Sequence, residues 1–220
     1  MLEVLCKFFS RKEYMDEFRS GKIYLKSLEW YQNSAMDNGQ KDVLEGSEFA
    51  AYGDNIELYI GGVKIEQVAN VHGGRDSYSR DTKASCFFLA SEISKNKFQF
   101  HSSMRAFGEY IIMVTNNVKF LKLLNEYSKN HSDVNLQYNK CKYIAENEFQ
   151  GSYSPFIKRD IYKNQNEWRL CITKHTDVDY EYIEVGDISD ITIVLDADGL
   201  FEKDRTGIKE IEISNIESFI

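Results

Sequence analysis

Short runs in which apolar residues alternate with polar ones, or cluster together, follow one another along most of the chain. Runs of this length, rich in β-branched and aromatic residues, are typical of β-strands. We expect strands at Glu3–Phe9, Lys22–Leu28, Phe49–Val68, Ala84–Ala90, Glu109–Thr115, Asn135–Ile144, Glu167–Thr173, Tyr180–Val185 and Ile191–Leu195, with a further alternating segment at Ile208–Ile216. Gly61-Gly62 separates two strand-like runs and predicts a two-residue hairpin turn.

Apolar residues recur every three or four positions in fewer places, and these places predict helices. The clearest is Asn116–Asn130, where apolar residues follow at three-residue steps: Val118, Leu121, Leu124 and Tyr127. Shorter helical segments are expected after Ser10, at Glu29–Asn33 and at Phe98–Phe107. Few helices among many strands are typical of a fold dominated by a sheet.

The first helix has recognisable signals at both ends. Ser10 and Glu13 fit a capping box, in which the two side chains satisfy backbone N–H groups of the first turn. Met15 and Phe18 give the helix an apolar face, and Gly21 is placed to end it. Helices and strands are mixed without a regular strand–helix–strand alternation. We therefore predict an α+β fold in a single domain, residues 1–220, with mainly antiparallel, strongly twisted sheet flanked by a few helices.

Segment 70–83 is the most loop-like part of the chain. Gly73 and Gly74 allow backbone angles that are closed to other residues, while Arg75, Arg80 and Lys83 add positive charge. Two interpretations stay open: a lid that closes over a ligand, or an ordinary surface loop.

The net charge of −8 is concentrated in one part of the chain. Segment 177–220 has thirteen acidic and three basic residues, whereas residues 1–176 carry a small positive balance. Segment 156–175 has a local balance of +3. A phosphate-bearing ligand or a nucleic acid is therefore compatible with one face of the protein, and the acidic segment suggests a basic partner.

The four cysteines are widely spaced and form no pair or Cys/His cluster with the spacing of zinc ligands. We expect buried free thiols, as in a reducing cytosol, at Cys6, Cys86, Cys141 and Cys171. No signal peptide is recognised, and no apolar run approaches the ~20 residues that cross a bilayer. The sequence predicts a cytoplasmic protein with no metal site and no membrane partner.

Common catalytic motifs are missing. The sequence has no Walker-type phosphate loop, no glycine-rich dinucleotide turn and no GxSxG nucleophile elbow. The four histidines are isolated from any Ser or Cys that looks activated. Chemistry must therefore be sought in less familiar combinations of residues.

Segment Tyr162–Ile172 is the most informative stretch. Gln165, Glu167, Trp168 and Arg169 fall within five residues, at the entry to an apolar strand. A carboxylate at the mouth of a buried strand is costly unless it is paired or faces a cleft. On a strand, Glu167 and Arg169 share one face and Trp168 points the other way, into the core. The segment predicts either a structural ion pair or an active site.

Four segments, in this order, resemble an uncharacterised bacterial family marked by a Glu-Trp-Arg box. They are Gly21–Tyr31 followed by Glu45-Gly46, then Ala84–Phe87, Met104–Ile111 and Tyr162–Leu170. The resemblance covers most of residues 18–190.

Gln165-x-Glu167 is also similar to the Gln/Glu-x-Glu turn of ADP-ribosyltransferases. This resemblance implies NAD as a substrate and Gln165 and Glu167 as catalytic residues, with Glu167 stabilising the ribosyl oxocarbenium ion. In that family a small hydroxyl residue on an earlier strand supports the glutamate, a position that Ser27 or Ser85 matches.

The same resemblance implies side chains that hold the cofactor. Cationic donors for the diphosphate and groups beside it are expected among Tyr24, Ser27, Arg105, Lys158 and Arg169. At the position where the family uses a first-strand Arg or His to hold NAD, this sequence has only Lys7 or Arg11 nearby.

Three functions follow from these patterns. The first is an ADP-ribosyltransferase that modifies a protein or nucleic acid in a toxin, phage-defence or anti-defence system. The second is a non-catalytic module that binds or sequesters a nucleotide-type ligand, with Glu167 holding the phosphate-binding cations in place. The third is a protein-interaction domain that uses its acidic segment.

Overall fold

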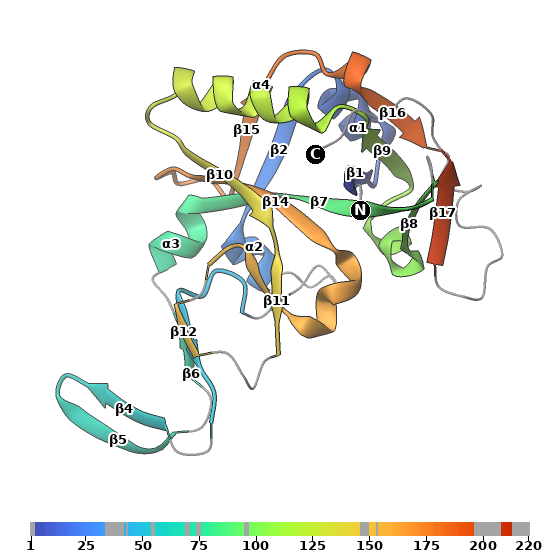
Figure 1. The fold of residues 1–220 in the computed structure, drawn as a ribbon. Coiled ribbons are helices and arrows are strands. Elements are labelled where there is room, and N and C mark those ends of the chain that lie inside the picture. Colours follow the sequence, from blue (N-terminus) through green and yellow to red (C-terminus); the bar gives the residue numbers. More distant parts are fainter. Residues whose placement is uncertain are drawn as a thin grey trace.

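The computed structural model of the protein describes residues 3–33, 42, 44–53, 56–68, 71–73, 76–94, 97–145, 150–152, 154–195 and 208–212. It confirms the α+β fold with a mainly antiparallel sheet and few helices (Figure 1). Ten of the described strands form the main sheet: β1 (Glu3–Phe9), β2 (Lys22–Ser27), β7 (Thr82–Ser94), β8 (Lys97–His101), β9 (Tyr110–Val114), β10 (Asn135–Lys140), β14 (Glu167–Thr173), β15 (Tyr180–Glu184), β16 (Thr192–Leu195) and β17 (Ile208–Glu212).

Strand β7 is the centre of this sheet because it pairs with four other strands: β1, β2, β8 and β14. The longest path of neighbouring strands runs β10-β14-β7-β1-β9-β16, while β15 is attached through β2 and β17 through β8. All of these pairings are antiparallel. The acidic segment is thus not a separate tail in its described part, since β15, β16 and β17 all join the main sheet.

Helices α1 (Lys12–Arg19) and α4 (Asn117–Asn130) lie together on one side of the sheet (Figure 1). The buried side chains of the two helices pack against the sheet and form an aromatic core with it. Phe18 and Phe120 pack against Phe87, and Trp168 meets the Phe87 ring edge-on at 5.4 Å. The prediction that Trp168 belongs to the core is therefore confirmed.

Both helices differ from the sequence prediction in detail. The residue before α1 is Arg11, with no side-chain cap, so the capping box at Ser10 was wrong. Helix α4 is capped by the Asn116 side chain. Of its predicted apolar face, Leu124 is buried and Leu121 and Tyr127 pack against the core, whereas Val118 is exposed and Phe120, which was not part of that face, is buried. The true helical repeat of 3.6 residues rotates the buried face away from a strict three-residue step.

The opposite side of the sheet carries a second apolar cluster around Phe8, Phe88, Met104 and Ile111. The helix predicted at Phe98–Phe107 is wrong in its first half. Residues 97–101 form strand β8, because they pair with β7 and β17, and only the 3-10 helix η1 (Ser102–Phe107) follows.

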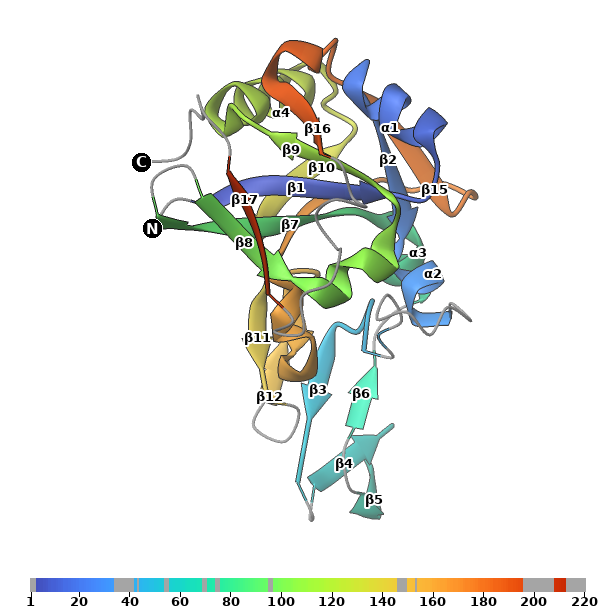
Figure 2. The same ribbon diagram turned by 90° about the vertical axis from the view of Figure 1, so that its right-hand side faces the viewer.

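A slender arm projects from the body of the protein (Figure 2). Its tip is the hairpin of β4 (Ile56–Ile60) and β5 (Val63–Val68), and its base is the small sheet of β3 (Phe49–Ala51), β6 (Val71–Gly73) and β12 (Gln150–Ser152). Gly61 and Gly62 have φ of 59° and 82° at the turn, which confirms the two-residue hairpin.

Short elements cover the lower side of the sheet in Figure 1: α2 (Leu28–Asn33), α3 (Asp76–Asp81), β11 (Lys142–Ile144), β13 (Ile157–Arg159) and the 3-10 helix η2 (Asp160–Gln165); η3 (Ser189–Ile191) precedes β16. The loop predicted at 70–83 is wrong for its described residues. These form β6, α3 and the start of β7, and Arg80 on α3 pairs with Glu29 on α2. Gly74 and Arg75 lie outside the described residues.

Candidate functional site

The main sheet splits at the middle of β7. On one edge, β14 pairs along Thr82–Phe88 without interruption. On the other edge, β1 pairs with Phe88–Ser91 and β2 pairs with Lys83–Ala84. Between them, at residues 85–87, no described strand pairs with this edge of β7. Such a split leaves backbone groups without ladder partners, and these groups need partners from elsewhere.

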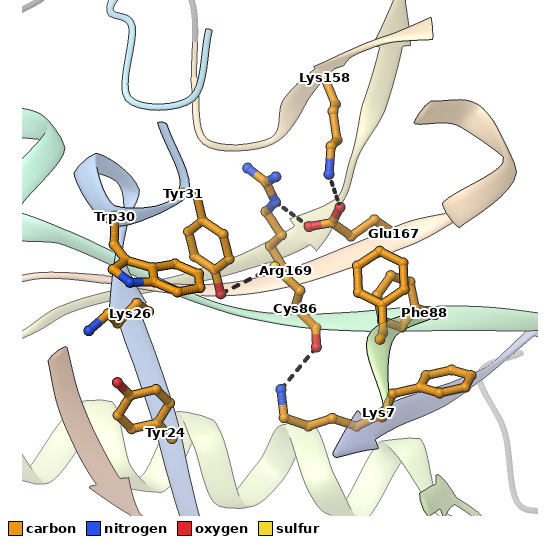
Figure 3. A pocket seen from close by; sticks show the side chains of 12 residues that line it. Lys7, Tyr24, Lys26, Trp30, Tyr31, Cys86, Phe88, Lys158, Glu167 and Arg169 are labelled. Carbon is orange, nitrogen blue, oxygen red and sulfur yellow. Dashed lines mark hydrogen bonds and ion pairs between the residues drawn. The ribbon is translucent and has the colours of Figure 1, made fainter. Parts of the chain in front are cut away.

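A cavity of about 250 Å³ opens at this split (Figure 3). A second compartment of about 560 Å³ adjoins it. We call the first the inner compartment and the second the outer compartment, and both together the cleft. The compartments share six lining residues: Lys7, Phe8, Tyr24, Trp30, Tyr31 and Phe107. Small-molecule sites usually have about 300–1,000 Å³, so the cleft is large enough for a ligand.

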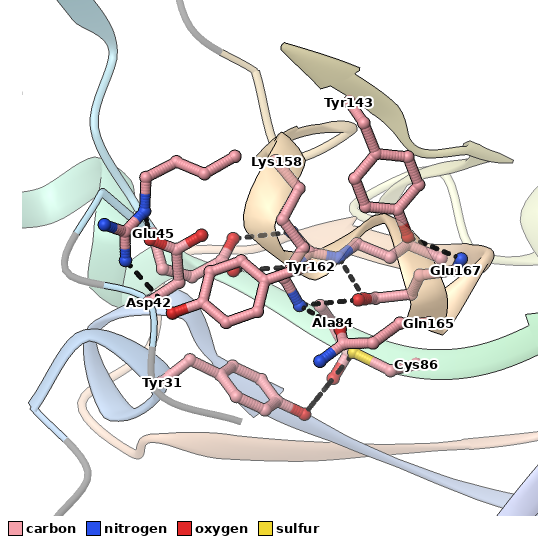
Figure 4. A network of polar contacts seen from close by, with 12 residues as sticks. Tyr31, Asp42, Glu45, Ala84, Cys86, Tyr143, Lys158, Tyr162, Gln165 and Glu167 are labelled. Carbon is pink, nitrogen blue, oxygen red and sulfur yellow. Dashed lines mark hydrogen bonds and ion pairs between the residues drawn. The ribbon is translucent and has the colours of Figure 1, made fainter. Parts of the chain in front are cut away.

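A buried ion cluster forms one wall of the inner compartment (Figures 3 and 4). The Lys158 ammonium donates to Glu167 Oε2 and to Gln165 Oε1, both at 2.7 Å. The Arg169 Nε donates to Glu167 Oε1 at 2.5 Å. Both oxygens of Glu167 are therefore paired with cations, and the predicted ion pair between Glu167 and Arg169 is present.

The other end of Arg169 is held by a residue far away in the sequence. Its Nη1 and Nη2 donate to the two oxygens of Glu45 at 2.5 and 2.7 Å, a bidentate pair. Nη1 also donates to the Pro155 carbonyl oxygen at 2.6 Å. Arg169 thus uses most of its donors inside the protein.

A local turn aims Gln165 and Glu167 at the same cation. Between them, Asn166 has a φ of 41°, in the left-handed region, and its side chain donates to the Leu89 carbonyl oxygen at 2.8 Å. Asn is among the few residues that tolerate this conformation. The turn ends η2 and starts β14, and both neighbouring side chains then reach Lys158.

Electrostatics keep Glu167 ionised. Burial raises the pKa of its carboxyl group, but the charges of Arg169 and Lys158 outweigh burial, and the net pKa lies well below its usual range. For Glu45 the balance is the reverse: burial is the largest cause, and its pKa is raised despite Arg169.

Lys7 occupies the split itself. Its ammonium donates to Ser85 Oγ at 2.8 Å and to the Cys86 carbonyl oxygen at 3.0 Å, so it satisfies a carbonyl at the unpaired edge of β7 (Figure 3). It lies 4.7 Å from the centre of the Phe87 ring. Burial lowers the pKa of Lys7 to about 8. Within the described part of the chain, Lys7 forms no ion pair, unlike Lys158 and Arg169.

The predicted site residues are only partly brought together. Glu167, Lys158, Arg169 and Tyr24 line the inner compartment, and Gln165 joins them through Lys158. Two do not line the cleft. Ser27 is buried, and its hydroxyl accepts a hydrogen bond from the backbone N–H of Trp30, whereas Arg105 donates to the Gly108 carbonyl oxygen. Of the two candidate hydroxyl residues, it is Ser85 that lines the cleft.

Sequence reasoning missed several residues at the cleft. The sequence points to Lys7 only as a residue near the position where the family holds NAD, and it predicts no site role for Trp30, Tyr31 or Cys86. Glu45 was seen only as part of a motif. The motif Ala84-Ser85-Cys86-Phe87 marked the split strand, but nothing in the sequence shows which strands leave its edge unpaired.

The cysteines are free as predicted, but only three of the four are buried. All four cysteines are free, with Cys6, Cys141 and Cys171 buried and Cys86 half-buried at the cleft. Among the described residues, no three His, Cys, Asp or Glu side chains gather where they could hold a metal ion. Of the helices that the structure describes, none is long and apolar enough to cross a membrane.

Comparisons with protein-family models, with curated proteins and with solved structures found no match to this chain. The resemblances to the Glu-Trp-Arg family and to ADP-ribosyltransferases therefore stay predictions from the sequence.

Proposed function

We propose that the cleft binds a nucleotide-type ligand, with a phosphate group at Lys7 and the base against the aromatic wall. The observation that carries this proposal is Lys7 itself. It is a half-buried lysine whose ammonium lines both compartments and has no carboxylate partner among the described residues. A charge that is partly removed from water and has no ionic partner is costly, so an incoming anion gains more there than at a lysine already paired.

The walls suit an aromatic ring. Tyr24, Trp30 and Tyr31 line both compartments, and Tyr14 and Tyr182 line only the outer one. Aromatic side chains beside a cation are the combination that binds nucleotides, since bases stack on rings and phosphates pair with ammonium groups.

Lys158 and Arg169 have a supporting role in this proposal. Their donors are largely occupied by Glu167, Gln165 and Glu45, and the two carboxylates balance the two positive charges, so Lys158 and Arg169 shape the wall of the inner compartment rather than bind phosphate directly. Glu167 holds both cations in place, but the phosphate contact that the binding-module hypothesis gave to them is assigned here to Lys7.

Lys7→Met tests the proposal, because methionine keeps most of the side-chain volume and removes the charge. A panel of AMP, GMP, CMP, UMP, ADP-ribose and NAD would be titrated by calorimetry against both proteins. Hydrogen bonds to a charged group contribute about 1.5–3 kcal/mol, so the variant should lose roughly 10- to 100-fold in affinity. Lys12→Met is the matched control, because Lys12 is exposed and pairs with the exposed Asp16. No binding by the wild type, or equal binding by a folded Lys7→Met variant, contradicts the proposal.

The affinity should also depend on pH in a defined direction. The pKa of Lys7 is lowered to about 8, chiefly by burial, so its ammonium is present below pH 8 and is lost as the pH rises above it. Between pH 7 and 9 the affinity should fall about tenfold, because a decade of pH above the pKa leaves about a tenth of the lysine charged. At pH 8, binding should take up protons, which calorimetry in buffers of different ionisation enthalpy measures.

The neighbouring Cys86 and Tyr31 are not expected to titrate between pH 7 and 9, so they should not contribute to this pH dependence. Burial raises the pKa of the Cys86 thiol to about 12 and that of the Tyr31 hydroxyl well above its usual value. In Lys7→Met, any residual affinity should therefore be constant from pH 7 to 9. If the affinity falls equally with rising pH in the wild type and in Lys7→Met, a group other than Lys7 causes the pH dependence.

An ADP-ribosyltransferase is the second candidate, and one observation favours it. Glu167 lines the inner compartment, where a ribose would lie. The acceptor would be a protein or nucleic acid. Against a catalytic role, both carboxylate oxygens already pair with cations.

A further inference from the structure

A patch of aromatic and basic side chains lies on one face of strands β2 and β15. In the antiparallel register Tyr182 faces Tyr24, and Tyr180 faces Lys26. Alternation along β2 places Lys22 on the same face, while Ile23 and Leu25 point into the core. We call Tyr24, Tyr180 and Tyr182 the tyrosine row.

The three rings contact one another directly. The Tyr24 ring lies 5.2 Å from that of Tyr182 and is stacked on Tyr180 at 5.9 Å. Lys22 lies 4.2 Å from the centre of the Tyr182 ring, and Lys26 lies 5.9 Å from that of Tyr180. Tyr24 and Tyr180 are nevertheless 42% and 43% exposed. Exposed rings held this firmly cost little entropy when another flat ring stacks on them.

The tyrosine row is continuous with the cleft. Tyr24 lines both compartments and Tyr182 lines the outer one, whereas Tyr180 lines neither. Among the described strands, β15 pairs with β2 alone, so the row ends at an edge of the described sheet. The row therefore leads from the nucleotide cleft to the open surface.

We infer that the tyrosine row is a stacking platform for single-stranded nucleic acid, whose terminal phosphorylated nucleotide occupies the cleft. This inference rests on the proposed function and names its ligand class: the end of a strand rather than a free nucleotide. Proteins that bind single strands combine aromatic platforms with neighbouring cations, and a base of any sequence can stack on a ring.

The two lysines beside the tyrosine row are already paired with carboxylates, so stacking on the rings is expected to be the main source of affinity there. Lys22 pairs with Glu17 at 3.4 Å and Lys26 with Asp179 at 2.7 Å. Both acids are exposed, and exposed ion pairs contribute little, so a phosphate can replace the carboxylate at either lysine. Lys7 then binds the terminal phosphate, which is the contact that requires the end of the nucleic-acid strand.

A comparison of ligand lengths tests this inference. The affinity of AMP would be measured beside those of hexaadenylate with and without a 5′-phosphate, using wild type, Tyr180→Ala and Tyr59→Ala. Tyr59 is the matched control, since it is 58% exposed on β4, in the projecting arm. Stacking of a base on a ring predicts that the phosphorylated hexamer binds wild type about 5- to 100-fold more tightly than AMP.

The variants then locate the contact. Tyr180→Ala should remove most of the advantage of the hexamer and leave AMP unchanged, and Tyr59→Ala should change neither. Removing the 5′-phosphate should weaken the hexamer. If AMP binds but the hexamer binds no more tightly, or Tyr180→Ala has no effect, the inference is overturned while the proposed function stands. If neither AMP nor the hexamer binds, the proposed function is overturned, and the inference with it.

Discussion

Replacing Glu45 with alanine is expected to lower the free energy of unfolding by about 3–5 kcal/mol. Glu45 provides both oxygens of the bidentate pair with Arg169, and both side chains are almost fully buried. Without Glu45, the Arg169 guanidinium keeps Glu167 and the Pro155 carbonyl oxygen as its partners among the described residues. Denaturant unfolding followed by circular dichroism measures the loss.

The matched control is Glu29→Ala, which breaks the exposed pair between Glu29 and Arg80 on the same side of the sheet. Exposed pairs contribute about 0–1 kcal/mol, so its effect should be several times smaller. The double variant Glu45→Met, Arg169→Met should be less destabilised than Glu45→Ala, because it buries no charge without its partner. Equal, small losses for Glu45→Ala and Glu29→Ala would contradict a stabilising role for the buried cluster.

Much of the sheet could be predicted because its strands carry their own pattern. The limits of β1 and β14 are those that the alternation of apolar residues predicts, Glu3–Phe9 and Glu167–Thr173. The hairpin at Gly61-Gly62 was predictable because the turn needs positive φ at both positions. Local chemistry determines these features, so the sequence alone reveals them.

The errors occur where pairing or packing overrides local signals. Residues 97–101 become a strand because β7 and β17 pair with them on either side, which no local pattern shows. Helix α1 begins after Arg11 although Ser10 has the better capping side chain. Cap and strand preferences are worth about 1 kcal/mol, which tertiary contacts readily exceed.

The candidate site likewise has features that the local sequence predicts and features that depend on the whole fold. That Glu167 and Arg169 share a face follows from strand geometry, and the pair is present. Glu45 lies 124 positions from Arg169, so their pairing depends on the whole fold. The importance of Lys7 is equally non-local, because it depends on β1 and β2 leaving part of β7 unpaired.

Glu167→Gln should lower the free energy of unfolding by about 3–5 kcal/mol at neutral pH, since it leaves Lys158 and Arg169 buried without their shared carboxylate. The stability of Glu167→Gln should also depend on pH differently from that of the wild type. The pKa of Glu167 is depressed by folding, so the stability it contributes is complete above its unfolded pKa of about 4.3 and is lost as the pH falls below that value. The wild type should lose this contribution in acid, and Glu167→Gln should have none to lose.

The same variant separates the two candidate functions when it is incubated with labelled NAD and cell lysate below its melting range. If the protein is a binding module, neither the wild type nor Glu167→Gln should give a labelled product. The nucleotide affinity of Glu167→Gln should then differ from that of the wild type only if the loss of Glu167 moves Lys158 and Arg169. A transferase predicts labelled protein or nucleic acid from the wild type and a loss of about 100- to 1,000-fold in Glu167→Gln, the usual effect of removing one well-placed electrostatic group. If the wild type is active and the folded variant retains that activity, Glu167 supports the fold and the catalytic assignment fails.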